Sequence, residues 1–226
     1  MKQALINCPS LANSSLLELE EDIRQFWNSG VRWFHIDIMD GHYVPNLCYP
    51  VRLVADLKAK YPQAIADVHM MVTDPAAYIE PLRAAGADYV SFHADSTHFV
   101  IRSLRAIREV GMKAGIVLNP SQQVDVIHPY LDWVDLVVLM TVEPGFAGQK
   151  FMVESLPRLE ELSKLREETG KEFLISIDGN YPNVQPCVRR GANLFVTGVY
   201  TVYRQPDGIP AACQRFEQEM RKGLVE

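Results

Sequence analysis

The chain has few cysteines, no surplus of positive charge and no long apolar run, and each absence excludes a class of protein. Its four cysteines lie far apart and form no Cys-x-x-Cys pair, which argues against a zinc knuckle, a redox motif or a disulfide framework. The formal net charge is −6, and the lysines and arginines are scattered. A nucleic-acid-binding protein would show a basic stripe, so we expect no nucleic-acid partner.

No apolar stretch approaches the length of a membrane span. The amino terminus has only the short run Ala4–Ile6, broken by Asn7, which is too short for the core of a signal peptide. We therefore expect no membrane partner and a cytoplasmic location. The chain does have enough apolar residues, 48% of 226, to bury a core as one domain spanning residues 1–226.

Short apolar runs alternate with longer amphipathic ones along the whole chain. The short runs predict strands at Leu5–Cys8, Trp33–Ile38, Ile65–Met71, Tyr89–Phe92, Lys113–Leu118, Leu136–Met140, Phe173–Ile177 and Leu194–Val196. The amphipathic segments predict helices at Leu16–Trp27, Val51–Lys60, Pro75–Ala84, Phe99–Glu109, Val153–Glu168, Val184–Arg189 and Ala211–Lys222, with a short one after Gln122. Strands that alternate with helices pair in parallel through right-handed crossovers.

Eight such units in a chain of this length predict an α/β fold, a single (β/α)₈ TIM barrel. The alternative is an open doubly wound sheet, which carries a glycine-rich turn after its first strand. This chain has Pro9-Ser10-Leu11-Ala12-Asn13 at that point. The barrel is therefore favoured.

Polar residues gather where the predicted strands end, which is the face that carries the active site in barrel enzymes. Because side chains alternate along a strand, His35 and Asp37 share one face of the second strand. His69 lies near the end of the third strand, and Asp178 follows the seventh. Two imidazoles and two carboxylates form a ligand set for one divalent ion per chain, but they do not distinguish zinc, manganese, iron and cobalt. Taken singly, each fits a hydrogen-bonded core histidine or a capping aspartate.

The loop after the sixth strand, and the ends of strands seven and eight, contain glycine and small residues that let backbone N–H groups approach an anion. Barrels frequently bind phosphate at this position. The expected phosphate-binding residues are Gly145, Phe146, Ala147, Gly148, Gly179, Asn180, Gly198 and Val199. The alternative is that Gly145 and Gly148 only make a tight turn.

Methionines and further histidines complete the expected rim of the site. Met39, Met71 and Met140 would line the mouth and keep water from an electron-rich intermediate, although methionine is often simple core filler. His93 closes the fourth predicted strand and is left out of the ligand set. The remaining histidines, His42, His98 and His128, fit loop or surface positions.

The segment from His35 to Asn46 resembles the H-x-D-x-M-D-G-x-[FY]-V-P-N signature of the ribulose-phosphate 3-epimerase family and matches it throughout. Shorter matches are Pro9-Ser10, His69-x-Met71-Val72, Leu118-Asn119-Pro120, Met140-Thr141-Val142-x-Pro144-Gly145-Phe146 and Asp178-Gly179. The resemblance implies a metal site at His35, Asp37, His69 and Asp178. It also implies that Asp37 and Asp178 transfer the proton, and that Ser10, His69, Asp178 and the glycine loops contact the substrate.

The departures from the family pattern lie at the phosphate end. Ala147, Asn180 and Val199 replace the family's Gly, Gly and Ser, and Asp95 replaces the Glu of its H-x-E motif. These changes leave open the length of the substrate. Phe146-Ala147-Gly148-Gln149 looks more like the allulose-6-phosphate 3-epimerase branch. Relatives are often dimers or hexamers, so by analogy we expect a homo-oligomer.

The resemblance implies a metal-dependent ketose-phosphate 3-epimerase whose small-molecule partner is a sugar phosphate. The substrate pair would be ribulose-5-phosphate and xylulose-5-phosphate, or allulose-6-phosphate and fructose-6-phosphate. Two carboxylates would exchange the C3 proton through a metal-stabilised enediolate. Two alternatives stay open. A related decarboxylase would carry D-x-K-x-x-D, whereas Asp37-Ile38-Met39-Asp40 has no lysine; a barrel that binds sugar phosphate without turnover would lack an acid or a ligand.

Overall fold

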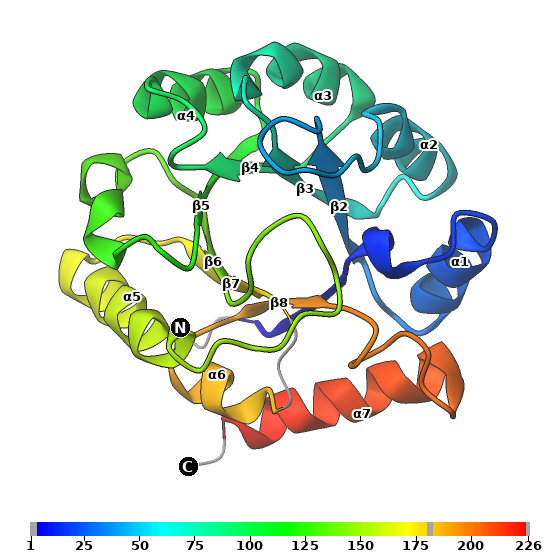
Figure 1. The fold of residues 1–226 in the computed structure, drawn as a ribbon. Helices are drawn as coiled ribbons and strands as arrows, with labels where there is room; N and C mark the ends of the chain where they lie inside the picture. The colour runs from blue at the N-terminus through cyan, green and yellow to red at the C-terminus, as the bar shows by residue number, and fades with distance from the viewer. Residues whose placement is uncertain (1–3, 180–182, 225–226) are drawn as a thin grey trace.

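The computed structural model describes residues 4–179 and 183–224, so Asn180 lies outside the described residues. Eight parallel strands form one sheet that curves into a nearly closed barrel, with helices around the outside (Figure 1). The strands are β1 (Ile6–Pro9), β2 (Trp33–Met39), β3 (Ile65–Met71), β4 (Tyr89–His93), β5 (Lys113–Leu118), β6 (Leu136–Met140), β7 (Leu174–Asp178) and β8 (Leu194–Thr197). The predicted TIM-barrel fold is confirmed.

Closure of the barrel is uneven around its circumference. Seven neighbouring pairs form regular ladders, from β2–β3 round to β8–β1. The eighth contact, between β1 and β2, is a single parallel bridge that joins Ser10 to His35. This seam therefore lies directly beside one of the predicted metal ligands.

The crossovers run mostly through helices, as the alternating pattern predicts. The α-helices are α1 (Leu19–Asn28), α2 (Arg52–Lys60), α3 (Ile79–Ala85), α4 (Val100–Glu109), α5 (Ser155–Thr169), α6 (Gln185–Arg189) and α7 (Gly208–Lys222). The 3₁₀ segments are η1 (Leu11–Asn13), η2 (Pro75–Tyr78) and η3 (Val124–Tyr130). The segment η3 is the short helix expected after Gln122, and it contains Pro129.

Most predicted boundaries differ from the structure by a few residues, and two of these differences are informative. Helix α1 begins at Leu19 rather than Leu16, and Leu16 and Leu17 are exposed in the preceding turn. Three acidic residues in its first turn suit the positive end of the helix dipole there. Strand β7 is displaced by one residue, which makes Asp178 its last residue.

Side chains of the strands divide into an outer and an inner apolar layer. Phe34, Ile36 and Ile38 of β2 belong to the outer layer, which the strands share with the helices. The inner layer fills the barrel axis and includes Val138 and Leu194. Because His35 and Asp37 alternate with the outer set, they face the interior, as predicted. Among the described residues, no helix is long and apolar enough to cross a membrane.

Candidate active site

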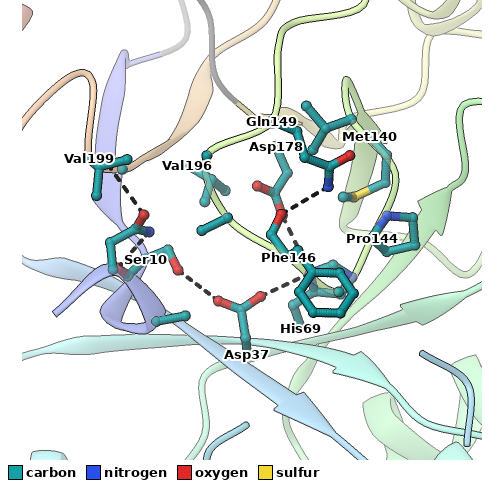
Figure 2. Close-up of a pocket in the computed structure, with 18 of the residues that line it drawn as sticks. Ser10, Asp37, His69, Met140, Pro144, Phe146, Gln149, Asp178, Val196 and Val199 are labelled. Carbon is teal, nitrogen blue, oxygen red and sulfur yellow. Dashed lines mark hydrogen bonds and ion pairs between the residues drawn. The ribbon is translucent and has the colours of Figure 1, made fainter. Parts of the chain in front are cut away.

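A cavity opens at the C-terminal ends of the strands, inside the ring of βα loops (Figure 2). Most of the site residues predicted from the sequence line it: Ser10, Asp37, Met39, His69, Met71, Met140, Gly145, Phe146, Ala147, Gly148, Asp178, Gly179, Gly198 and Val199. His35 is fully buried next to the cavity. The residues predicted from the sequence therefore line one cavity at the C-terminal ends of the strands.

The four predicted metal ligands converge from β2, β3 and β7. His35 Nε2 lies 3.5 Å from Asp37 Oδ1 and 3.6 Å from Asp178 Oδ2. His69 Nδ1 lies 3.5 Å and 3.4 Å from the same two oxygens. Ligands about 2.1 Å from a tetrahedral ion stand roughly 3.4 Å apart. The four donor atoms thus have the spacing of a mononuclear site.

The two ligand nitrogens also lack any other partner. His35 Nε2 and His69 Nδ1 are buried and have no hydrogen-bond partner among the described residues. A buried polar nitrogen left unpaired is costly, whereas a metal ion would satisfy both at once. The residues therefore fit a divalent ion on two independent grounds, the spacing of the ligand atoms and the unpaired nitrogens.

A buried carboxylate that the sequence analysis did not single out holds the first imidazole. Asp67 is fully buried, and its Oδ2 lies 2.7 Å from His35 Nδ1. This contact places the proton of a neutral imidazole on Nδ1 and leaves the Nε2 lone pair for a metal ion. Asp67 lies two residues before His69, so strand alternation alone would have identified it as an inward-facing residue.

A second residue outside the predicted ligand set, His93, contacts the other imidazole. It is fully buried at the end of β4, and its Nε2 lies 2.8 Å from His69 Nε2. One of these two nitrogens must donate and the other accept. If His69 ligates through Nδ1, its Nε2–H donates to His93. The sequence predicted that His93 ends its strand, but it could not show which neighbour its ring meets.

The charges in the cluster shift one another's pKa values. Burial alone would raise the pKa of Asp37 and of Asp178, but the close ion-pair contacts with the imidazoles outweigh it and hold both pKa values below their ordinary range. Burial alone would lower the pKa of His35 and of His69, but the carboxylates outweigh it and raise both. A metal ion must therefore displace imidazole protons when it binds.

Asp37 and Asp178 differ in what supports them. Asp37 Oδ2 accepts a hydrogen bond of 2.7 Å from the hydroxyl of Ser10, which leaves Oδ1 for the imidazoles. Asp178 is held through its backbone, because Thr141 donates both its N–H and its hydroxyl to the Asp178 carbonyl, each at 2.8 Å. The side chain of Asp178 is consequently the freer of the two. Figure 2 shows both carboxylates directed into the cavity.

The residues expected to bind phosphate differ in their surroundings after β7 and after β6. Gly179 has a φ of +137°, and a Cβ there would lie 2.1 Å from the Thr141 hydroxyl, so only glycine fits. In the loop after β6, the exposed amides of Phe146, Ala147 and Gly148 have no acceptor within the described parts of the chain. These amides are open to an incoming anion.

The amides after β8 are instead already paired. Gly198 N donates to the hydroxyl of Thr201 at 2.9 Å, and Val199 N donates to Asn13 Oδ1 at 3.3 Å. The two expected phosphate donors of this loop therefore have acceptors inside the protein. Asn13, which the sequence analysis did not select, is one of those acceptors and lines the cavity.

The remaining predicted residues lie where the sequence placed them. Met71 and Met140 line the cavity and are almost fully buried, so they serve the wall and the core together. The side chains of His42, His98 and His128 are exposed. These three histidines are therefore loop and surface residues, as predicted.

Comparison with known proteins agrees with the site. Residues 6–202 match the family model described as the Ribulose-phosphate 3 epimerase family. A ribulose-phosphate 3-epimerase of Bacillus subtilis is 40% identical over 208 residues, which cover 88% of this chain and 92% of the relative. One of Escherichia coli K12 is 35% identical over 228 residues, which cover 100% and 98%. The chain belongs to the ribulose-phosphate 3-epimerase family, and it is an isomerase, a ketose-phosphate 3-epimerase.

Solved structures support the fold. KGPDC from Streptococcus mutans superposes with a TM-score of 0.70 at 16% identity and covers 97% of this chain and 98% of its own. The tryptophan synthase alpha subunit of Legionella pneumophila gives a TM-score of 0.62 at 10% identity, with coverages of 96% and 93%. At such low identities the likeness extends to the barrel alone.

Proposed function

We propose that the protein is a metal-dependent 3-epimerase that interconverts ribulose-5-phosphate and xylulose-5-phosphate by two-base proton transfer at C3. The observation that carries the proposal is the joint placement of Asp37 and Asp178 around two buried imidazole nitrogens that have no other partner among the described residues. The names of the relatives support the five-carbon pair. Allulose-6-phosphate and fructose-6-phosphate remain the second candidate pair, favoured by the Ala147 and Gly148 form of the β6 loop.

His35, Asp37, His69 and Asp178 would hold one divalent ion of zinc, manganese, iron or cobalt. Such an ion supplies Lewis-acid stabilisation of negative charge on substrate oxygens. Met39, Met71 and Met140 would exclude water from the reacting carbon. Ser10 fixes the orientation of Asp37 through its hydroxyl.

Inversion at C3 requires a base on one face of the sugar and an acid on the other. In each direction one of Asp37 and Asp178 is ionised and removes the proton, while the other carries a proton and returns it. The imidazoles stabilise the ionised form of each carboxylate. The ionised form is the one that the proton-removing member of the pair needs.

The phosphate of the substrate would lie at the opposite end of the cavity. The open amides of Phe146, Ala147 and Gly148 and the close backbone of Gly179 form an anion-binding surface without lysine or arginine. Gly198 and Val199 would complete it. The protein would act in the cytoplasm as a homo-oligomer, with the barrel as one domain over residues 1–226.

The test follows deuterium at C3 by NMR, with metal-saturated enzyme in D₂O and each epimer in turn. Asp37→Asn and Asp178→Asn should each reduce epimerisation by about 10²–10⁴-fold. Each variant should still exchange the proton of the one epimer whose base it retains. Exposed Asp125→Asn, far from the cavity, is the matched control. Near-wild-type epimerisation by either active-site variant would replace this mechanism with one that uses a single base.

A further inference from the structure

The loop after β8 satisfies almost all its own backbone amides. Thr201, Val202 and Tyr203 donate their N–H groups to the Gly198 carbonyl at 3.1, 3.1 and 3.2 Å. Gly198 itself donates to the Thr201 hydroxyl. Of the six amides from Gly198 to Tyr203, Val199 alone donates to a side chain of another element, and Tyr200 has no acceptor among the described residues. An anion can take over the Val199 N–H without opening the turn.

The acceptor is Asn13, at the end of η1. Its Nδ2 donates to the Ser10 carbonyl at 3.2 Å, and its Oδ1 accepts from Val199 N at 3.3 Å. The first bond fixes the orientation of the amide, since a flipped amide would turn two donors toward each other and two acceptors toward each other. Figure 2 shows the contact to Val199 as a dashed line.

The side chain of Asn13 can lie against the backbone of residue 198 because that residue is glycine. A Cβ on Gly198 would lie 3.0 Å from Asn13 Oδ1, which is tighter than ordinary contact. The amide therefore lies directly over the backbone that the proposed phosphate site would use. Its oxygen and a phosphate oxygen are both acceptors, so they compete for the single Val199 N–H.

We infer that Asn13 is a specificity-determining residue, whose side-chain oxygen occupies the Val199 amide in place of the substrate's phosphate and must be displaced when that phosphate binds. This inference rests on the proposed phosphate end of the cavity. Asn13 lowers the affinity for every anion that uses the Val199 amide, so only an anion that also gains the open amides of the β6 loop is held well. It thereby selects for a phosphate held at both loops at once.

The first test measures inorganic phosphate as a competitive inhibitor of the metal-loaded enzyme. Asn13→Ala frees the Val199 amide and should lower the inhibition constant about two- to tenfold, the worth of one modest hydrogen bond. Asn13→Asp puts a negative charge at the same place and should raise the constant. Asn28→Ala, an exposed asparagine at the end of α1, is the matched control and should leave it unchanged. A constant that rises in Asn13→Ala, or does not move, would overturn the inference.

The second test follows the ¹⁵N–¹H resonance of Val199 as phosphate is added. It should shift in the wild type and saturate at a lower phosphate concentration in Asn13→Ala. A resonance that phosphate leaves in place would overturn the inference even if the variants fold poorly. The proposed function fails on a separate result, namely equal turnover of free and phosphorylated ketose by the wild-type enzyme.

Discussion

The two ends of the cavity are prepared for their ligands in opposite ways. At the metal end, His35 Nε2 and His69 Nδ1 are buried without partners among the described residues, while their other ring nitrogens contact Asp67 and His93. At the anion end, the β8 amides already have acceptors. The metal end is thus preorganised for a ligand, whereas at β8 a ligand must exchange with a partner that is already bound.

The difference follows from where the donors come from. Side chains on strands are fixed by the barrel and cannot relax to satisfy one another, so the imidazole nitrogens stay unpaired. In the loop after β8, Asn13 and Thr201 provide acceptors for two amides, whereas the amides of the β6 loop have none among the described residues.

Removal of the metal ion should have the largest effect on activity. Enzyme stripped by a chelator should lose activity by at least about 10³-fold, because several kcal/mol of charge stabilisation disappear. Metal titration should restore it with about one ion per chain, counted by atomic emission. His69→Ala should bind the ion more weakly, with exposed His128→Ala as the control. Full activity of the stripped protein would disprove metal dependence.

Removal of a residue that contacts a metal ligand should weaken metal binding less than removal of the ligand itself. His93→Ala removes the partner of His69 Nε2 and should weaken metal binding about 10–100-fold. His93→Gln retains an acceptor and should recover part of that loss. The measurement is competition with a fluorescent chelator, and His98→Ala, at the surface, is the control. If His93→Ala binds metal as tightly as the wild type, the contact at 2.8 Å does not position His69.

The anion end of the cavity should raise kcat/KM by increasing the affinity for phosphorylated substrates. Unphosphorylated ketoses should have a kcat/KM lower than that of the phosphorylated sugar by at least about tenfold, the worth of one or two charge-assisted hydrogen bonds. Rates for ribulose and ribulose-5-phosphate, measured side by side, check this. Equal values would mean that the loops after β6 and β8 do not bind phosphate.

The pH should change the metal affinity of the cluster. The raised pKa values of His35 and His69 mean that the metal-free cluster holds protons above the ordinary value of 6.5. Metal binding must release them, so affinity should rise with pH until the raised pKa values are passed, by up to about tenfold per pH unit for each proton. Calorimetry in buffers of different ionisation enthalpy counts the protons. A metal affinity that does not change between pH 6 and 8 would contradict the raised pKa values of His35 and His69.

In the metal-free protein, the contribution of His35 and His69 to the free energy of unfolding should fall as pH rises, whereas metal affinity rises. Groups whose pKa is raised on folding stabilise the folded state fully below their unfolded pKa, and this contribution is lost as pH rises through the folded value. The lowered pKa values of Asp37 and Asp178 act oppositely, since their contribution is lost in acid. Thermal melts of stripped enzyme separate the two, because the carboxylate contribution is lost below the ordinary pKa of 3.8 and the imidazole contribution above the ordinary pKa of 6.5.

Strand periodicity predicted much of the molecule. Three strands were predicted with their observed bounds, Ile65–Met71, Lys113–Leu118 and Leu136–Met140. The convergence of His35 and Asp178 followed from the rule that barrel strands end on one face. Such reasoning works because alternation along a strand is a local property that does not depend on which strands are neighbours.

Contacts between strands and loops were beyond that reasoning. The pairing of His69 with His93 depends on ring rotations that the sequence does not encode locally. The bond from Val199 to Asn13 joins opposite ends of the chain and forms only once β1 lies beside β8. The family resemblance likewise gave the types of residue at the phosphate end, but not the acceptors already present there.

The single bridge between β1 and β2 has a consequence for local opening of the fold. Elsewhere the barrel is held by continuous ladders, so the seam at Ser10 and His35 is where we expect backbone amides to exchange with solvent first. Ser10 also orients Asp37 through its hydroxyl. A brief separation of the seam would release the carboxylate of Asp37 while the remaining seven strand pairs stay intact. Mild denaturant should therefore silence the enzyme before it unfolds the barrel.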